Sequence, residues 1–335
     1  MKEASYYTPL DDGKVRCGLC PHQCLLRSGE TGICLARSNR EGRLISDNYG
    51  KVTSLHSDPV EKKPLYHFFP GSNILSAGSY GCNLKCSWCQ NAGISQSGNG
   101  HFASLPITYP EEILASLERF QVIGLAYTYN EPAIWFEYVR DVARLVLAAG
   151  RKNVVVSNGF INADPLEELM ELVHAFNIDL KAFSGAFYKQ YTGGNLAAVL
   201  NTLGNIRRKG LHLELTFLLV GGLNDDAASF RDMLEWISGE LGSQTVLHIS
   251  RYHPAWQLHE PATPLAVMQQ FYEMARERLP FVYLGNAPEL TGTSDTRCPA
   301  CGNLAVERKG YHTAVTAVDG LGRCTHCLEQ LPFVV

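Results

Sequence analysis

Three cysteines, Cys82, Cys86 and Cys89, stand at a C-x3-C-x2-C spacing on one short stretch of the chain. The apolar run Ile74–Ala77 before them is expected to form a buried strand, and Gly81 then lets the backbone turn because glycine tolerates positive φ. Three thiolates on one loop can bind three irons of a cubic iron–sulfur cluster and leave the fourth iron open. Zinc is the alternative, but structural zinc normally takes four ligands arranged in pairs. We therefore expect a 4Fe-4S cluster here.

This loop resembles the signature of the radical S-adenosylmethionine (SAM) superfamily, including an aromatic residue, Trp88, directly before the last cysteine. The resemblance implies that the open iron is chelated by the amino and carboxylate groups of SAM. It also implies reductive cleavage of SAM to methionine and a 5′-deoxyadenosyl radical, which makes the enzyme an oxidoreductase. Cys82, Cys86 and Cys89 would then be catalytic residues as well as metal ligands.

All eleven cysteines of the chain fall into three groups, so no thiol is left over. One group is odd in number, and disulfides are rare in a reducing compartment, so metal binding explains the grouping better than a disulfide framework does. The other two groups have four members each: Cys17, Cys20, Cys24 and Cys34 near the start, and Cys298, Cys301, Cys324 and Cys327 near the end.

The first four-cysteine group lies in an N-terminal module that we place at residues 1–68. Short C-x2-C and C-x3-C turns bring sulfurs together, and nearby glycines let the chain fold back so that Cys34 completes the site. Four thiolates suit zinc and an iron–sulfur cluster about equally. We expect His22 to face the solvent beside the metal, with a role as a substitute ligand as the alternative, and we interpret residues 58–64 as a linker to the next domain.

The second four-cysteine group lies in a C-terminal module at residues 291–335. Two C-x2-C knuckles at this separation are a strong indication of a metal site. The module resembles a rubredoxin or a zinc ribbon. Leu328 follows the second knuckle, where rubredoxin has glycine, so structural zinc is the favoured metal and iron the alternative.

Between the two modules, residues 69–290 alternate short apolar strands with amphipathic helices. Such alternation produces a parallel sheet with right-handed crossovers, so the fold class is α/β. We predict a partial (β/α)6 TIM-like barrel of the radical SAM type, with a doubly wound open sheet as the alternative. The expected strands, with a short seventh, are Ile74–Ala77, Val122–Tyr127, Val154–Ser157, Ile178–Leu180, Leu213–Val220, Val246–Ile249 and Phe281–Leu284.

Polar residues follow five of these strands, and in βα barrels the chemistry lies at the carboxyl ends of the strands. A carboxylate can accept hydrogen bonds from an ammonium group, so Glu131 and Lys181 suit the two charges at the methionine end of SAM. Each motif alone has a structural explanation, and the hypothesis depends on all of them meeting at one barrel mouth. The candidate cofactor-binding residues are Trp88, Asn91, Thr128, Tyr129, Asn130, Glu131, Ser157, Asn158, Asp179, Lys181 and His253.

Several of these motifs resemble the pyruvate formate-lyase activating enzyme branch of the superfamily: Tyr-Asn-Glu-Pro, Asn-Gly, Asp-Leu-Lys, Gly-Gly-Leu-Asn-Asp, Tyr-His and the Cys-Gln-Asn of the cluster loop. The resemblance covers residues 70–290. It implies that Asn130 and Glu131 lie near the SAM amino group, and that the other polar strand ends contact its carboxylate or ribose. Ser157 follows Val156 where the activating enzyme has Asp-Thr, so this contact departs from the family pattern.

The whole chain is similar to the AmmeMemoRadiSam system radical SAM enzyme, through its Cys-x-Leu-Cys-Pro-His-x-Cys front, its barrel and its two-knuckle tail. That family is associated with two other small protein families, which are candidate partners. The resemblance implies an electron donor such as flavodoxin or ferredoxin, and a protein, peptide or small molecule as substrate. It does not supply the substrate itself.

Composition excludes several classes of function. A net charge of −4 over 335 residues provides no basic field for nucleic acid or anionic lipid. The chain contains no run of 18 apolar residues that could span a membrane, and the first residues lack the apolar core of a signal peptide, so we expect a cytoplasmic protein.

Two other functions remain open: a glycyl-radical-enzyme activating enzyme, and a non-enzymatic iron–sulfur electron carrier. A zinc-stabilised scaffold would leave the three-cysteine site unexplained.

Overall fold

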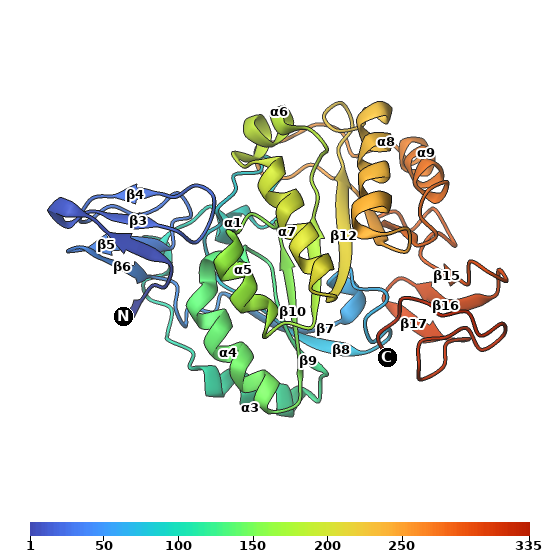
Figure 1. The fold of residues 1–335 in the computed structure, drawn as a ribbon, viewed down its shortest axis with the longest axis horizontal. Coiled ribbons are helices and arrows are strands. Elements are labelled where there is room, and N and C mark those ends of the chain that lie inside the picture. Colours follow the sequence, from blue (N-terminus) through green and yellow to red (C-terminus); the bar gives the residue numbers. More distant parts are fainter.

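The computed structural model describes residues Met1 to Val335, and its centre is one eight-stranded sheet (Figure 1). Neighbouring strands from β8 to β14 pair in parallel, and β7 pairs antiparallel with β8. The strands, in their order across the sheet, are β14 (Val282–Gly285), β13 (Val246–Arg251), β12 (His212–Leu219), β11 (Ala175–Asp179), β10 (Lys152–Ser157), β9 (Gly124–Tyr127), β8 (Asn73–Gly78) and β7 (Ser54–Pro59).

The strand order identifies the architecture as a partial barrel. Each strand lies beside its neighbour in sequence, whereas a doubly wound sheet reverses its order at one point. The two edge strands, β7 and β14, do not pair with each other, so the barrel stays open. The predicted fold class is therefore confirmed, and the seventh parallel strand forms as well.

Helices connect the strands and pack against the outside of the sheet (Figure 1). In α4, the buried residues Val139, Val142, Ala143 and Val146 recur at the helical period, so one stripe of the helix faces the strands. The main helices are α3 (Pro110–Phe120), α4 (Phe136–Ala148), α5 (Ala163–Met170), α7 (Leu196–Arg208), α8 (Ala227–Trp236) and α9 (Leu265–Arg276).

Shorter helical segments complete the barrel and its loops. None of the helices is both long and apolar enough to cross a membrane. The segments are η1 (Asp11–Gly13), η2 (Val60–Lys62), α1 (Ala92–Ser95), α2 (Asn99–Phe102), η3 (Pro132–Trp135), α6 (Gly185–Phe187) and the π-helical turns η4 (Tyr188–Thr192) and η5 (Ile237–Leu241).

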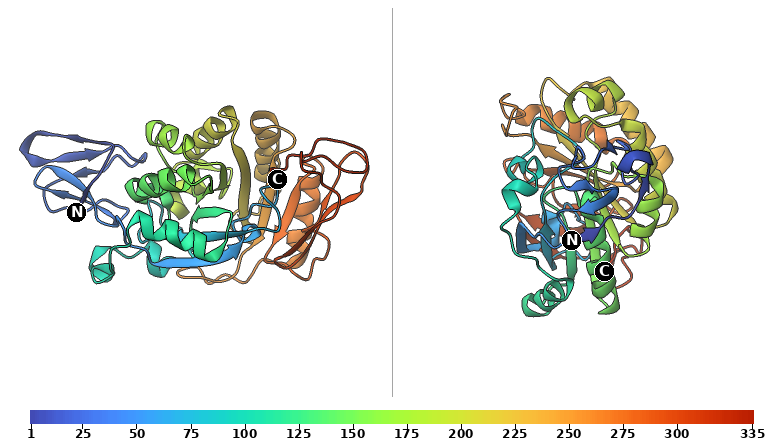
Figure 2. Two further views of the ribbon diagram at one scale, coloured as in Figure 1. Left: turned by 90° about the horizontal axis from the view of Figure 1, so that it is seen from below. Right: turned by 90° about the vertical axis from the view of Figure 1, so that its left-hand side faces the viewer.

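The N-terminal module consists of two small antiparallel sheets at one end of the molecule (Figure 2). One sheet contains β1 (Lys2–Glu3), β5 (Arg37–Arg40) and β6 (Arg43–Ser46), and the other contains β2 (Tyr7–Pro9), β3 (Val15–Cys17) and β4 (Leu25–Leu26). Strand β7 belongs to the barrel sheet, so the barrel begins earlier in the chain than the boundary expected after residue 68. The expected linker at residues 58–64 is the end of β7 and the turn η2.

The C-terminal module lies at the opposite end of the molecule (Figure 2). Its strands β15 (Thr296–Arg297), β16 (Leu304–Lys309) and β17 (His312–Val315) form an antiparallel sheet. Phe68 forms a parallel bridge with Val334, and the guanidinium of Arg308 donates a 2.6 Å hydrogen bond to the carbonyl of Tyr66. The segment that leads into the barrel therefore also holds this module in place.

Candidate active site

A cavity of about 370 Å³ opens among the carboxyl ends of the parallel strands. The three cysteines of the loop after β8 line it, together with polar residues from β9 to β13. Ten of the eleven predicted cofactor-binding residues line this one cavity: Trp88, Asn91, Thr128, Tyr129, Asn130, Glu131, Ser157, Asn158, Asp179 and Lys181.

The cysteine loop turns at Gly81, which has a φ of +83° as the sequence predicted. A Cβ atom at this position would collide with the carbonyl oxygen of Cys34, so glycine is needed for space as well as for conformation. Within the loop, the backbone N–H of Leu84 donates to the Cys82 sulfur at 3.4 Å, and the sulfur of Cys89 lies 3.1 Å from the hydroxyl of Ser95. Backbone and side-chain contacts thus fix the loop around its thiols.

The three thiols fit an iron–sulfur cluster better than a single metal ion. Their sulfurs do not converge within 4.8 Å of one another, although all three line the same cavity. Burial raises the pKa of Cys82 well above its usual value and that of Cys86 to about 11, and a bound metal cation would favour the thiolate form of both. Soft thiolates suit an iron–sulfur cluster, and the adjoining cavity gives a fourth iron room for a further ligand.

The Glu131 carboxylate lies at the junction between β9 and β10. It is buried and accepts hydrogen bonds from the backbone N–H of Ala133 at 2.9 Å, the hydroxyl of Ser157 at 2.7 Å and the backbone N–H of Asn158 at 2.8 Å. Burial raises the pKa of Glu131, and these donors lower it in part. Since a carboxylate has about four acceptor sites, one remains for a ligand ammonium.

Asn130 supports the cluster loop with its side chain. Its carbonyl oxygen accepts a hydrogen bond from the backbone N–H of Ser79 at 3.0 Å, and its amide donates to the carbonyl of Gly81 at 3.0 Å. The preceding residue, Tyr129, has a φ of +73°, and its carbonyl accepts a 2.6 Å hydrogen bond from the side chain of Asn91. These contacts hold the loop after β9 against the loop after β8.

Lys181 and Asp179 face the cavity from the end of β11. Their Nζ and Oδ2 atoms are 2.8 Å apart, as the same-side placement on a strand predicted. Burial alone would lower the pKa of Lys181, but Asp179 and the nearby Cys86 sulfur raise it above its usual value. The cavity therefore contains a permanent positive charge beside one of the cluster ligands.

His253 is the one predicted residue that the structure leaves outside the cavity lining. Strand β13 ends at Arg251, and the next residue, Tyr252, buries its ring and donates from its hydroxyl to the carbonyl of Leu258 at 2.8 Å. That turn leaves His253 exposed to solvent. The Tyr-His motif thus contributes a packed tyrosine rather than a cavity histidine.

Lys62 and Lys63 also line the cavity, although the sequence did not predict them as site residues. Both lysines bond to Asp58, with Nζ–O distances of 3.1 and 2.9 Å, and Tyr129 donates to the same carboxylate at 3.1 Å. Burial would raise the pKa of Asp58, but the two lysines hold it at about 2. The sequence feature that could have indicated their role is the pair of adjacent lysines inside the segment expected to be a linker. The other missed lining residues include Thr216, Leu218, Ser250 and Asn286 from β12, β13 and the loop after β14.

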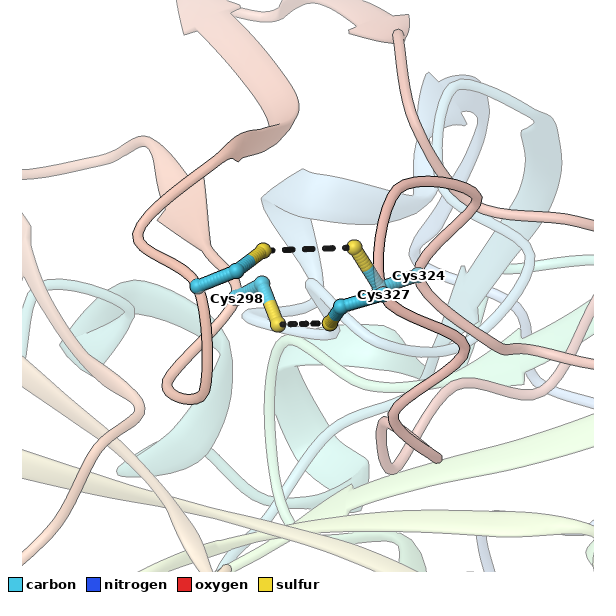
Figure 3. Close-up of side chains that lie close together, drawn as sticks. Cys298, Cys324 and Cys327 are labelled. Atoms are coloured by element: carbon cyan, nitrogen blue, oxygen red, sulfur yellow. Dashed lines mark hydrogen bonds between the residues drawn. The ribbon is translucent and has the colours of Figure 1, made fainter.

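The four C-terminal cysteines form a compact single-ion site. Figure 3 shows Cys298, Cys324 and Cys327 with their sulfurs facing across the gap between the two knuckles. The Sγ atoms of Cys298 and Cys327 are 3.5 Å apart, those of Cys301 and Cys324 are 3.8 Å apart, and all four lie within 4.8 Å of one another. Four bonds of about 2.3 Å to one zinc ion place sulfurs about 3.8 Å apart, so the residues fit one tetrahedral metal ion.

The two C-terminal knuckles have the same backbone geometry. Gly302 follows the first with a φ of +73° and donates its N–H to the carbonyl of Cys298 at 2.9 Å. Leu328 follows the second with a φ of +65° and donates to the carbonyl of Cys324 at 2.8 Å. Leucine thus adopts the left-handed conformation that glycine takes more easily, so the substitution does not change the shape of the knuckle.

The four N-terminal cysteines line a small cavity together with Arg37. Cys17, Cys20 and Cys34 are buried, and no three of the four sulfurs converge within 4.8 Å. His22, which we expected to face the solvent, is half buried, and its Nε2 atom lies 2.7 Å from the carbonyl oxygen of Asn83 in the other cysteine loop. The two cysteine sites are therefore in direct contact.

Comparison with known proteins gives three findings. Residues 77–237 match the radical SAM superfamily. The uncharacterized protein MJ0808 of Methanocaldococcus jannaschii is 38% identical over the full length of both chains. The structure of SuiB from Streptococcus suis bound to S-adenosylmethionine has a TM-score of 0.50 at 12% sequence identity, covering 64% of this chain and 52% of that one, and this likeness concerns the fold.

Proposed function

Because the chain contains a radical SAM superfamily domain and belongs to one family with the Methanocaldococcus jannaschii protein along its whole length, we propose that it is a radical SAM enzyme. Cys82, Cys86 and Cys89 would bind a 4Fe-4S cluster, and SAM would occupy the adjoining cavity. When bound, the cluster would supply the electron for reductive cleavage of SAM, and the 5′-deoxyadenosyl radical so formed would abstract a hydrogen atom from the substrate. One observation supports the proposal above all: three wide-set thiols open onto a 370 Å³ cavity lined by polar strand ends.

Different residues of the cavity would bind the two charged groups of SAM. Lys181 offers a positive charge for a carboxylate, and the free acceptor site of Glu131 offers a partner for an ammonium group. Ser157 and Asn158 hold Glu131 in place, and Asn158 also donates to the side chain of Asn83 at 2.9 Å. Preorganised partners of this kind reduce the ordering cost when a ligand binds.

We place the enzyme on the pyruvate formate-lyase activating enzyme-like branch, and within it in the AmmeMemoRadiSam group. The strand-end motifs and the full-length arrangement of cysteine modules support this assignment. The substrate would be a protein, a peptide or a small molecule, and the other two protein families of that system are candidate partners. Flavodoxin or ferredoxin would supply the electron, and zinc would occupy the compact C-terminal site.

An iron–sulfur electron carrier is the alternative from another class. A carrier has no need of a large polar cavity beside its open iron, and this argues for the enzyme. The deciding test is anaerobic reconstitution with iron and sulfide, followed by incubation with SAM and a strong reductant. We expect methionine and 5′-deoxyadenosine to form. If the reduced cluster persists with SAM uncleaved, the protein is a carrier and the proposal is wrong.

The glycyl-radical alternative within the superfamily can be tested in the same preparation. Proteins that co-purify under anaerobic conditions would be incubated with the reconstituted enzyme, SAM and reductant. A glycine-centred radical in a partner, seen by electron paramagnetic resonance, would assign the activating function. Consumption of SAM with a modified peptide or metabolite and no protein radical would instead assign direct modification of that peptide or metabolite.

A further inference from the structure

Besides the active-site and C-terminal cysteine groups, the N-terminal module contains a further candidate metal centre, which has no role in the proposed function. Its four cysteines line one small cavity together with Arg37. Around one zinc ion each sulfur lies about 2.3 Å from the metal, so the four sulfurs lie about 3.8 Å from one another. The C-terminal sulfurs show that close arrangement, and the N-terminal sulfurs do not.

The spacing therefore favours a multi-iron cluster over a single ion. In a 4Fe-4S cluster each thiolate binds a different iron, so the four sulfurs stand farther apart than around one metal. The three sulfurs of the active-site loop are also wide-set. By its spacing, the N-terminal group resembles the active-site cysteines rather than the C-terminal ones.

A second, independent observation comes from Arg37, which lines the same cavity. This residue is only 1% exposed, and its terminal nitrogens bond to Glu137 and to the carbonyl of Ser5. Its Nε–H has no partner, although a buried donor without an acceptor is costly. A thiolate or sulfide of a bound cluster would accept from this N–H, since a metal–thiolate group carries negative charge.

The position of the module places this centre next to the active site. Asn83 follows the cluster ligand Cys82 directly, and its side chain lies against the Cys20 thiol. The carbonyl of Asn83 bonds to His22 at 2.7 Å, and the carbonyl of Cys34 packs against Gly81. One residue therefore separates the ligands of the two sites.

We propose that Cys17, Cys20, Cys24 and Cys34 bind a second 4Fe-4S cluster, which exchanges one electron with the cluster at Cys82, Cys86 and Cys89. With four thiolates this second cluster has no open iron, so it would not bind SAM. In the exchange it is oxidised by one electron as its neighbour is reduced by one, and no atom or proton moves. A one-electron donor of the flavodoxin or ferredoxin class then reduces it again. The proposal depends on the proposed function only for the identity of the neighbouring cluster.

Metal analysis of the full-length protein tests the site without relying on activity. After anaerobic reconstitution we expect about eight irons and eight sulfides per chain, with one further metal in the C-terminal site. Replacing Cys82, Cys86 and Cys89 together by alanine should leave about four irons and four sulfides, with a spectrum that SAM does not change. If that variant retains zinc but no acid-labile sulfide, the N-terminal site binds zinc and the proposal is wrong.

A matched variant in the other module separates this inference from the proposed function. Cys20→Ser with Cys24→Ser should halve the iron and sulfide content and leave a cluster whose spectrum still responds to SAM. Loss of one zinc ion with unchanged iron would overturn the inference and leave the SAM assignment intact. If the variant does not fold, the alanine triple variant still decides the question.

Electron paramagnetic resonance tests the adjacency of the two clusters. In the reduced wild-type protein we expect spin–spin coupling that broadens both signals, and we expect each single-cluster variant to lose this broadening. Two independent, unbroadened signals in the wild type would contradict electron exchange between neighbours.

Discussion

The hydroxyl of Ser157 donates a 2.7 Å hydrogen bond to the buried carboxylate of Glu131, and this bond joins the ends of β9 and β10 at the cavity. Glu131 consequently has two roles, because it fixes the strand ends and offers its remaining acceptor site to a ligand. A variant that removes the carboxylate combines both effects, so ligand affinity and folding stability have to be measured separately.

The first prediction concerns SAM affinity. Lys181→Ala and Glu131→Gln each remove a charged partner, and a hydrogen bond to a charged group contributes roughly 1.5–3 kcal/mol. Each variant should therefore bind SAM about ten- to a hundred-fold more weakly. The dissociation constant would be measured by calorimetry on the reconstituted protein, with thermal unfolding recorded for each variant.

His253→Ala is the matched control for these variants, since His253 is polar and follows a strand end but is exposed and outside the cavity lining. It should bind SAM as the parent does. If Lys181→Ala and Glu131→Gln also bind with parental affinity, the strand-end residues are structural and this assignment of the site is wrong.

The second prediction concerns the active-site loop. Replacing Cys82, Cys86 and Cys89 together by alanine should abolish reductive cleavage of SAM while the barrel remains folded, because the sheet and its helices do not depend on these thiols. Formation of 5′-deoxyadenosine would be followed by chromatography, and folding by circular dichroism. Undiminished cleavage by the triple variant would refute the cluster assignment.

The sequence predicted the barrel because its signals were local. Each strand is a short apolar run between helix start and stop residues, and the structure has a parallel strand at every predicted position. Helix starts are harder to predict from the sequence. Asp164 before Pro165 has the residue pattern of an N-cap followed by a proline at the first helical position, but α5 begins at Ala163 after Asn162, whose side chain makes no capping bond.

The sequence could not reveal which residues meet through tertiary structure. Strand β7 joins the sheet as an antiparallel edge, which brings Lys62 and Lys63 to the cavity from a segment that resembled a linker. The contact between His22 and Asn83 joins two cysteine motifs 61 positions apart. The spacing of the cysteines identifies each motif in the sequence, whereas only the fold shows that the two motifs are neighbours.

The third prediction concerns acid sensitivity at the base of the barrel, where Glu214 is fully buried. Burial would raise the pKa of Glu214, but hydrogen bonds from His212 and His248 hold it well below its usual value. A carboxyl group with a lowered pKa stabilises the fold above its unfolded pKa of about 4.3, and this contribution is lost as the pH falls below that value. Burial also lowers the pKa of His67 well below its usual value, so stability falls as the pH drops below about 6.5.

Urea unfolding at pH 7, 5, 4 and 3 would check this dependence, with Glu214→Gln compared at each pH. The parent should lose stability as the pH falls, and the difference between parent and variant should shrink below about pH 4.3, because Glu214 then takes up a proton in the unfolded chain but not in the folded one. A difference that is constant across this range would show that the ionised carboxylate contributes nothing.

The fourth prediction concerns the C-terminal metal. Four thiolates that converge on one ion couple metal binding to folding, so replacing Cys298 and Cys301 by serine should release one metal ion per chain and unfold only residues 291–335. The barrel and the N-terminal module share a core of 57 buried residues that contains no residue of the tail, so the barrel should keep its melting transition. Limited proteolysis and metal analysis would follow the two effects, with Cys301→Ser alone as a milder variant because Cys301 is exposed. Unchanged metal content and unchanged protease resistance of the tail in the double variant would show that these cysteines do not hold a structural metal.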